Sequence, residues 1–148
     1  MTQRHPHVGK PSLSSQLLEG RAPFEALSLA YALPMLLSAP MGDGHPVLLM
    51  PGFMGSEGSL IALETYLRNR GYAVRTWGLG RNVGFRPGHA SAIEQQIRYL
   101  HHESGRTVSL VGWSLGGVFA MYGAHRCPEG VRSVVTLGSP VTVDAAGT

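Results

Sequence analysis

The sequence predicts an α/β fold, in which a parallel sheet of about four strands is flanked by helices and preceded by an N-terminal helical arm. Two observations predict it. Short apolar runs typical of buried strands alternate along the chain with segments whose apolar residues recur at helical spacing. Turns rich in glycine and proline separate these segments. Strands that alternate with helices form a parallel sheet joined by helical crossovers.

Composition limits the class of protein. The chain has 148 residues, enough for one domain with its own core, and 43% hydrophobic content with 14% charged residues is typical of a globular protein. The formal charge is +3, but the arginines are scattered and no basic run is interleaved with aromatics, so no nucleic-acid partner is expected. The single cysteine, Cys127, excludes an intramolecular disulfide and has no metal-type spacing, and we expect it to be a buried apolar residue.

The N-terminal arm contains the most apolar stretch of the chain, Phe24 to Pro40. It fits a signal peptide poorly, because it starts far from the N-terminus, contains Glu25 and is interrupted by Pro34. It is also too short and too broken to span a bilayer. We expect helices over 11–40 that pack on the domain or rest on a membrane surface, and a cytoplasmic protein.

A turn cluster at 41–46, "MGDGHP", marks the predicted boundary between an arm at 1–44 and a core at 45–148. The apolar run at 47–51 then predicts a strand buried on both faces. The following segment predicts a helix that Gly71 ends. Its apolar stripe consists of Leu60, Leu63, Tyr66 and Leu67. Residues 72–79 predict the second strand.

The second half of the chain repeats this alternation. Ser91 and Glu94 have the spacing of a capping box for a helix that Gly105 ends. The apolar stripe of this helix is Ile93, Ile97 and Leu100. Residues 107–112 predict the third strand, and a helix starts at or near Ser114. Its predicted stripe is Leu115, Val118, Phe119 and Tyr122. Residues 131–140 predict the fourth strand.

Ser114 lies at the junction between the third strand and its helix, in the pattern G-x-S-x-G. The pattern alone is weak, but a sharp strand-to-helix turn strains the serine and requires glycine two residues to either side. Gly112 and Gly116 meet this requirement, and Gly117 adds room for close helix–strand packing. The positive end of the helix dipole would favour an anion developing at Ser114, which makes this residue a candidate nucleophile.

The glycine-rich loop after the first strand, "PGFMGS", is the second element of a predicted acyl-transfer site. Such a site needs two backbone N–H donors for an oxyanion. One comes from the residue after the nucleophile, Leu115, and the other from the loop after the strand two units earlier. By position, Phe53 is the predicted donor in that loop.

Four segments carry a resemblance to a known family: "VLLMPGFMGSE", "GYAVRTWGLGRN", "VSLVGWSLGGVFAMYGA" and "VRSVVTLGSPV". Over about residues 45–142 the chain resembles the α/β-hydrolases, and within them bacterial lipases and esterases. Many members have His-Gly where this chain has Pro51-Gly52, and His where it has Trp113. Both differences look tolerable, because the oxyanion donors are backbone groups.

The resemblance implies that Ser114 is the nucleophile and that the backbone N–H groups of Phe53 and Leu115 form the oxyanion hole. It implies hydrolysis or transfer of the acyl group of a carboxylic ester, without a metal or cofactor. The substrate would be a small-molecule or lipid-like ester. The Phe53-Met54 pair and the apolar stretch at 24–40 favour lipid-like acyl chains.

The other members of a catalytic triad are harder to find. In the family an acid and then a histidine follow the serine. No histidine follows His125, which lies about 16 Å along the helix from Ser114. Asp144 follows the fourth strand and is the candidate acid. His89 lies in a loop, but its place in the chain order does not match the family.

His45 is expected at the opposite end of the sheet, and His101 and His102 near the end of the preceding helix. The resemblance therefore implies an N-terminal portion of a longer hydrolase that lacks the C-terminal acid and histidine segments. Such a chain would expose a sheet edge, self-associate and show little or no turnover.

Two alternatives stay open. An acyltransferase could use the same scaffold, with an alcohol or amine in place of water. The domain could also be a non-catalytic binding module in which Ser114 is a relic. A nucleotide-binding α/β fold is discounted, because no G-x-G-x-x-G follows a strand and no phosphate-binding G-x-x-x-x-G-K-[ST] is present.

Overall fold

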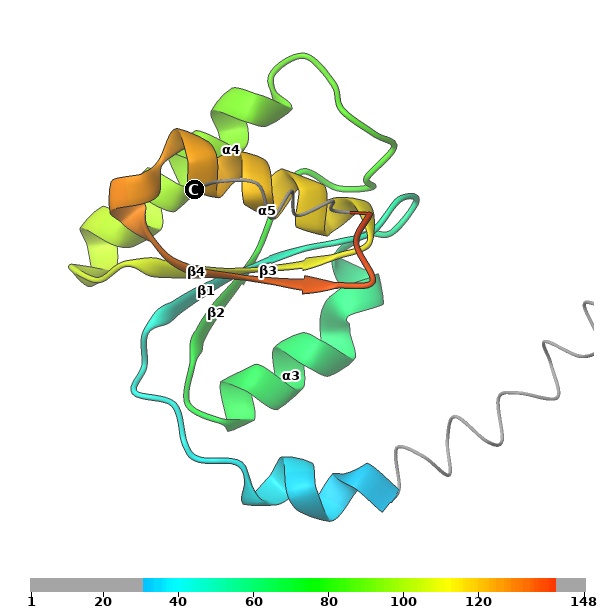
Figure 1. Ribbon diagram of the computed structural model, residues 1–148, viewed down its shortest axis with the longest axis vertical. Coiled ribbons are helices and arrows are strands. Elements are labelled where there is room, and N and C mark those ends of the chain that lie inside the picture. Colours follow the sequence, from blue (N-terminus) through cyan, green and yellow to red (C-terminus); the bar gives the residue numbers. More distant parts are fainter. Residues whose placement is uncertain (1–30, 141–148) are drawn as a thin grey trace, which may run out of the picture. The chain divides into compact units, whose positions relative to one another are not determined.

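A computed structural model describes residues 31–140 of the chain. This part contains a sheet of four parallel strands in the order β2-β1-β3-β4 (Figure 1). The strands are β1 (Pro46–Met50), β2 (Ala73–Thr76), β3 (Val108–Trp113) and β4 (Val131–Leu137). The predicted fold class, a parallel sheet of about four strands flanked by helices, is confirmed.

Helices cover both faces of the sheet (Figure 1). On one face lie α4 (His89–Ser104) and α5 (Leu115–Arg126). On the other lies α3 (Ile61–Asn69), preceded by the 3₁₀ helix η1 (Glu57–Leu60). A second 3₁₀ helix, η2 (Pro128–Gly130), leads from α5 into β4.

All five residues of β1 are buried, as its unbroken apolar run predicts. Successive side chains of a strand point to opposite faces. Leu48 and Met50 therefore join the core under α4 and α5, while Val47 and Leu49 join the core under α3. Cys127 is fully buried in the first of these cores, as expected, and burial raises the pKa of its thiol.

Two strands are shorter than predicted, because glycines with positive φ end the extended backbone. The second strand stops at Thr76, and Gly78 has φ 68°. The side chain of Trp77 turns into the core, and its Nε1 donates a hydrogen bond to the carbonyl of Gly80 at 2.9 Å. The fourth strand stops at Leu137, before Gly138 with φ 59°.

The capping-box prediction for α4 is wrong. This helix starts at His89, and its N-cap is Gly88 with φ 90° rather than Ser91. The turn that leads into the helix lies before Ser91, where the N–H of His89 donates a hydrogen bond to the carbonyl of Arg86 at 3.1 Å. The hydroxyl of Ser91 instead donates to the carbonyl of Gly88 at 3.0 Å. Gly105 ends the helix in the left-handed region, as predicted.

The buried face of α5 also differs from the predicted stripe. Phe119 is buried, but Val118 is exposed, and the other buried positions of the helix are glycines and an alanine: Gly116, Gly117, Ala120 and Gly123. Small residues let the helix axis approach the sheet closely, a contact that apolar periodicity does not reveal.

The contacts of the chain divide it after Pro40. Residues 31–38 are helical, which agrees with the helical arm expected there, and residues 1–30 lie outside the described part. The boundary predicted between 44 and 45 stays a prediction. Within the described residues, no helix is long and apolar enough to cross a membrane.

The carboxyl ends of the central strands bring two separate segments together. In the pairing of β1 with β3, Met50 lies opposite Gly112. The residues that follow, Pro51-Gly52 and Trp113-Ser114, therefore lie side by side at this end of the sheet. This edge of the sheet is where ligands bind in open parallel α/β sheets.

Candidate functional site

Ser114 occupies a strained turn between β3 and α5. It is the single residue between the strand and the helix, with φ 51° and ψ −119°. These angles are those of the first central residue of a type II′ turn, a position that glycine dominates. The N–H of Ser114 donates to the carbonyl of Leu137 in β4 at 2.8 Å, and this bond ties the turn to the neighbouring strand.

The glycines on either side of Ser114 are required by close approach. A Cβ on Gly112 would overlap the carbonyl of Gly116 one turn into the helix. A Cβ on Gly116 would overlap the carbonyl of Met50 and lie 2.7 Å from that of Pro51. Gly117 is also confined, because a Cβ there would overlap the side chain of Ser139. The helix start is therefore pressed against the ends of β1 and β4.

The loop after β1 lies directly against this turn. A Cβ on Gly52 would lie 3.2 Å from both Ser114 Cβ and the carbonyl oxygen of Trp113. The loop closes on itself through a hydrogen bond from Gly55 N–H to the carbonyl of Gly52 at 2.9 Å. Met54, at its tip, has φ 61°, and with Ser114 it is one of two described non-glycine residues with positive φ. Strained residues of this kind cluster at functional sites.

Phe53 and Leu115, the predicted oxyanion donors, follow Gly52 and Ser114 at this contact. Neither backbone N–H has a backbone acceptor within residues 31–140. The N–H of Leu115 is one of the first in α5, which have no partner inside a helix and point along the positive end of its dipole. Within the described residues, neither group is therefore engaged in a backbone hydrogen bond.

Asn82 is a residue of this site that sequence reasoning missed. It is fully buried, and its Nδ2 donates to the carbonyl of Pro51 at 2.8 Å. Its backbone donates to the carbonyl of Gly55 at 2.8 Å and accepts from Met54 N–H at 2.6 Å. Asn82 therefore holds the loop that carries Phe53 at both ends. In the sequence it is one polar residue among glycines, which indicates only a turn.

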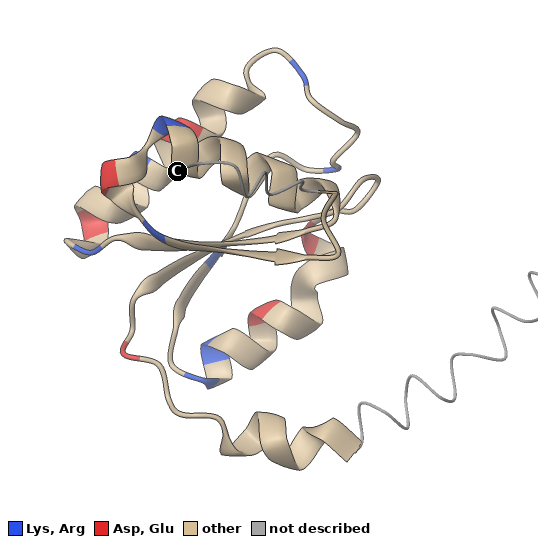
Figure 2. Cartoon of the chain, in the orientation of Figure 1, with Lys and Arg blue, Asp and Glu red and all other residues tan. Residues whose placement is uncertain are grey.

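Three large apolar side chains are exposed next to Ser114 in the sequence or in the loop after β1. Phe53 is 62% exposed, Met54 51% and Trp113 46%. The first turn of α5 has no acidic residue, and its ribbon is tan in Figure 2.

Within residues 31–140 the hydroxyl of Ser114 has no hydrogen-bond partner. His125 lies on α5, eleven residues further along the helix, and is exposed. His101 lies at the end of α4, where its Nδ1 is 3.0 Å from the carbonyl oxygen of Arg106. His102 is its exposed neighbour. Asp144, the predicted acid, lies outside the described residues.

His89, the first residue of α4, packs into an aromatic cluster. Its ring lies edge-on to Trp77 and Phe119, with centroids 5.6 and 6.1 Å away. Its Nδ1 is buried and has no partner among the described residues. His45 lies at the amino end of β1, at the other end of the sheet from Ser114.

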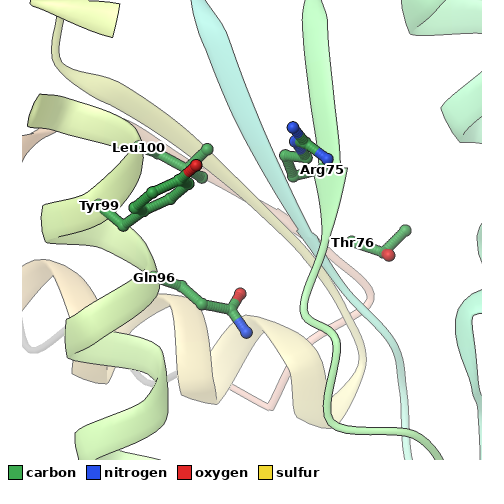
Figure 3. Close-up of a pocket in the computed structure, with 5 residues that line it drawn as sticks. All are labelled: Arg75, Thr76, Gln96, Tyr99 and Leu100. Atoms are coloured by element: carbon green, nitrogen blue, oxygen red, sulfur yellow. The ribbon is translucent and has the colours of Figure 1, made fainter. Parts of the chain in front are cut away.

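The described residues include no group of three or more His, Cys, Asp or Glu side chains that could hold a metal ion. A cavity of about 210 Å³ lies between β2 and α4 (Figure 3). Arg75, Thr76, Gln96, Tyr99 and Leu100 line it. None of these residues belongs to the turn at Ser114 or to the loop after β1, so this cavity is separate from the site.

No family model matches the chain. Among curated proteins it is 32% identical to a pimeloyl-[acyl-carrier protein] methyl ester esterase of Shewanella woodyi, over 43% of this chain and 33% of that protein. The chain thus spans about a third of the length of the curated relative that it matches.

Solved structures agree in fold. A lipase of Bacillus licheniformis in its mature form superposes with a TM-score of 0.54 at 22% identity, over 70% of this chain and 44% of the lipase. A probable hydrolytic enzyme of Pseudomonas aeruginosa gives 0.54 at 21%, over 69% and 35%. A monoacylglycerol lipase of Paleococcus ferrophilus gives 0.51 at 21%, over 74% and 45%. The chain covers less than half of each of these proteins.

Proposed function

We propose that this chain, which has the fold of part of an α/β-hydrolase, carries the acylation site of a serine hydrolase acting on carboxylic esters. The observation that carries the proposal is the contact between Ser114 and the loop after β1. A strained serine meets Gly52 there, next to the N–H groups of Phe53 and Leu115, which have no backbone acceptor within residues 31–140. The relatives are an esterase and lipases, which supports carboxylic esters as the substrate class.

In the proposed reaction, Ser114 Oγ attacks the ester carbonyl carbon and its proton passes to a general base. The carbonyl oxygen becomes an oxyanion that accepts hydrogen bonds from the N–H groups of Phe53 and Leu115. The ester C–O bond then breaks, and the alcohol leaves with the proton. Removing one such donor costs about 10²–10³-fold in rate in other enzymes.

The base of this reaction is not among the residues placed against Ser114 within 31–140. A serine hydroxyl without a base is a poor nucleophile. We therefore expect the 148-residue chain to turn over esters slowly or not at all, while still reacting at Ser114 with a strong acylating or phosphonylating reagent.

A fluorophosphonate probe followed by peptide mapping tests the proposal. We expect the probe on Ser114, with no labelling of this site in Ser114→Ala. Labelling should be unchanged in Ser91→Ala, whose hydroxyl donates to the carbonyl of Gly88 at the start of α4. Mapping in a Ser109→Ala background keeps the assignment unambiguous, because Ser109 and Ser114 share one tryptic peptide. A folded chain that is labelled elsewhere but never at Ser114 would refute the proposal.

That negative outcome would instead support a second candidate, a non-catalytic domain that binds an acyl ligand. The observation that favours it is the absence of any hydrogen-bond partner for the Ser114 hydroxyl in the described part of the chain. An acyltransferase on the same site is distinguished from a hydrolase by its products, with water and with alcohols as acceptors.

Lipid-like substrates and two surface contacts complete the proposal. Phe53, Met54 and Trp113 present an apolar surface for an acyl chain. The edge strand β4 exposes Val135 and Leu137, which would support self-association, measurable by light scattering against protein concentration. The helical residues 31–38 expose several apolar side chains, which would support membrane contact through 24–40, measurable by flotation with vesicles.

A further inference from the structure

A second hydroxyl group in the chain is hydrogen-bonded to a histidine that is itself hydrogen-bonded to a carboxylate. These residues lie at the amino ends of β1 and β3, far from Ser114 along both strands. Asp43 Oδ1 lies 2.7 Å from His45 Nδ1, and His45 Nε2 lies 3.0 Å from Ser109 Oγ. The order is acid, base, hydroxyl.

The direction of the hydrogen bonds follows from the state of Asp43. Hydrogen bonds from His45 and Arg106 hold the pKa of this carboxyl well below its usual range. An ionised carboxylate only accepts, so Nδ1 of His45 carries the proton in this pair. In the neutral ring Nε2 is then an acceptor, 3.0 Å from the hydroxyl oxygen of Ser109. This is the arrangement in which a neutral imidazole takes a proton from a serine.

Two cations surround the carboxylate. Arg106 Nη1 donates to the backbone carbonyl of Asp43 at 2.7 Å, and its Nη2 pairs with the carboxylate. Arg132 Nη1 lies 3.8 Å from Asp43 Oδ2. It also lies 3.2 Å from His45 Nδ1, but this contact is no hydrogen bond while Nδ1 carries the proton that Asp43 accepts. The contacts of Arg106 and Arg132 with Asp43, together with the hydrogen bond from the His45 backbone N–H at 3.2 Å, hold the acid in place.

Ser109 is one of the residues that line a cavity of about 310 Å³. Its polar lining consists of His45, Ser109, Ser133, Arg132 and Tyr72, and valines of β1, β3 and β4 with Leu67 of α3 complete it. Ser109 itself is 8% exposed, and its Oγ lies 3.0 Å from Ser133 Oγ. The cavity is large enough for a small acyl group, and Arg132 places a positive charge in its wall.

We propose that Ser109 is a second acylation site, activated by His45 and Asp43 and open to small activated carboxylic esters. Ser109 Oγ attacks the carbonyl carbon while its proton passes to His45 Nε2. The ester C–O bond breaks, and the proton moves from His45 to the departing alkoxide. The products are an acyl ester on Ser109 and a free alcohol, and Asp43 keeps its charge throughout.

Acetylation by p-nitrophenyl acetate tests this inference in a Ser114→Ala background, so that it stands or falls separately from the proposed function. Trypsin then yields the peptide 107–126, in which Ser109 is the only serine, whereas Ser133 lies on a different peptide. We expect release of one equivalent of p-nitrophenolate and one acetyl group on Ser109, located by fragmentation.

Variants of the base and the acid decide the role of the hydrogen bonds. His45→Gln should lower the rate of Ser109 acetylation by about 10²-fold, the usual contribution of a positioned base. Asp43→Asn, at an exposed position, should also lower it and covers the case in which His45→Gln does not fold. Ser91→Ala should change nothing. Acetylation of Ser109 that is equally fast in Asp43→Asn, or no acetylation of Ser109 in the folded parent, would overturn the proposal.

Discussion

The strained backbone of Ser114 leads to a prediction about stability. Whether a substitution there stabilises or destabilises the fold depends only on the conformation of this turn. At φ 51° and ψ −119° a residue with a Cβ is strained, whereas glycine is not. Within residues 31–140 the Ser114 hydroxyl makes no hydrogen bond that a substitution would break. Replacing Ser114 with glycine should therefore stabilise the fold.

The magnitude follows from two opposing effects. Backbone strain of this kind costs about 1–3 kcal/mol. Glycine loses more backbone entropy on folding, which costs about 0.5–1 kcal/mol. The net effect of Ser114→Gly is a gain of about 1 kcal/mol in the free energy of unfolding, or about 4 °C in Tm. Ser114→Ala keeps the strain and should stay within about 0.5 kcal/mol of the parent.

Urea denaturation followed by circular dichroism measures these differences. The control is Gln95, an exposed residue in the middle of α4, where Gln95→Gly should be less stable than Gln95→Ala by about 1 kcal/mol. The glycine-minus-alanine difference should thus have opposite signs at the two positions. If Ser114→Gly is no more stable than Ser114→Ala, the turn is not strained and this account of the site fails.

Three further predictions follow from the same contacts. Asn82→Leu removes the donor to the buried carbonyl of Pro51, so it should lower the free energy of unfolding in urea by about 1–3 kcal/mol. It should also slow probe labelling at Ser114. Unchanged labelling would show that other contacts hold the loop. Gly116→Ala should abolish soluble expression or lower the free energy of unfolding by more than about 3 kcal/mol. Gly58→Ala should be tolerated, because the nearest atom to its added Cβ would lie 3.8 Å away. Equal effects of the two substitutions in a stability assay would contradict the packing argument. The folded-state pKa of Asp43 is depressed, so its stabilisation is present above the unfolded pKa of about 3.9 and is lost as the pH falls below it. The urea midpoint of Asp43→Asn should therefore lie below that of the parent near neutral pH and approach it in acid, and a gap that persists in acid would argue against the ionised pair.

Local patterns were sufficient where each element depends on its own residues. The unbroken apolar run of β1 and the stripe of Ile93, Ile97 and Leu100 on α4 led to the correct elements, because burial of these side chains is a property of a short segment. The predicted start of α4 was wrong, because a helix can begin after a glycine such as Gly88 as well as at a capping box. The sequence contains no pattern that distinguishes these two possible starts. The buried face predicted for α5 was also wrong. Most of its buried positions are glycine or alanine, and these small residues do not stand out as an apolar stripe at helical spacing.

Part of the candidate site could likewise be predicted from the sequence, and part could not. The sequence placed Ser114 at a strand-to-helix junction, with Phe53 in a loop after another strand, since both positions follow from the order of elements. It did not indicate Asn82, because the direction of a buried amide depends on a loop about thirty residues away in the chain, at Pro51. It also treated His45 only as a residue at the far end of the sheet.

By itself, the sequence determined the α/β class, the alternation of elements and the location of the turn at Ser114, since these depend on hydrophobic periodicity and on glycines at fixed spacing. Only the tertiary structure decided that Gly52 lies against Ser114, that Asn82 holds the intervening loop, and that Asp43, His45 and Ser109 form one line of hydrogen bonds. Those relations join residues up to 66 positions apart, from Asp43 to Ser109, and they arise from the register of neighbouring strands. Strand register is set by packing across the sheet, which no single segment of the chain contains.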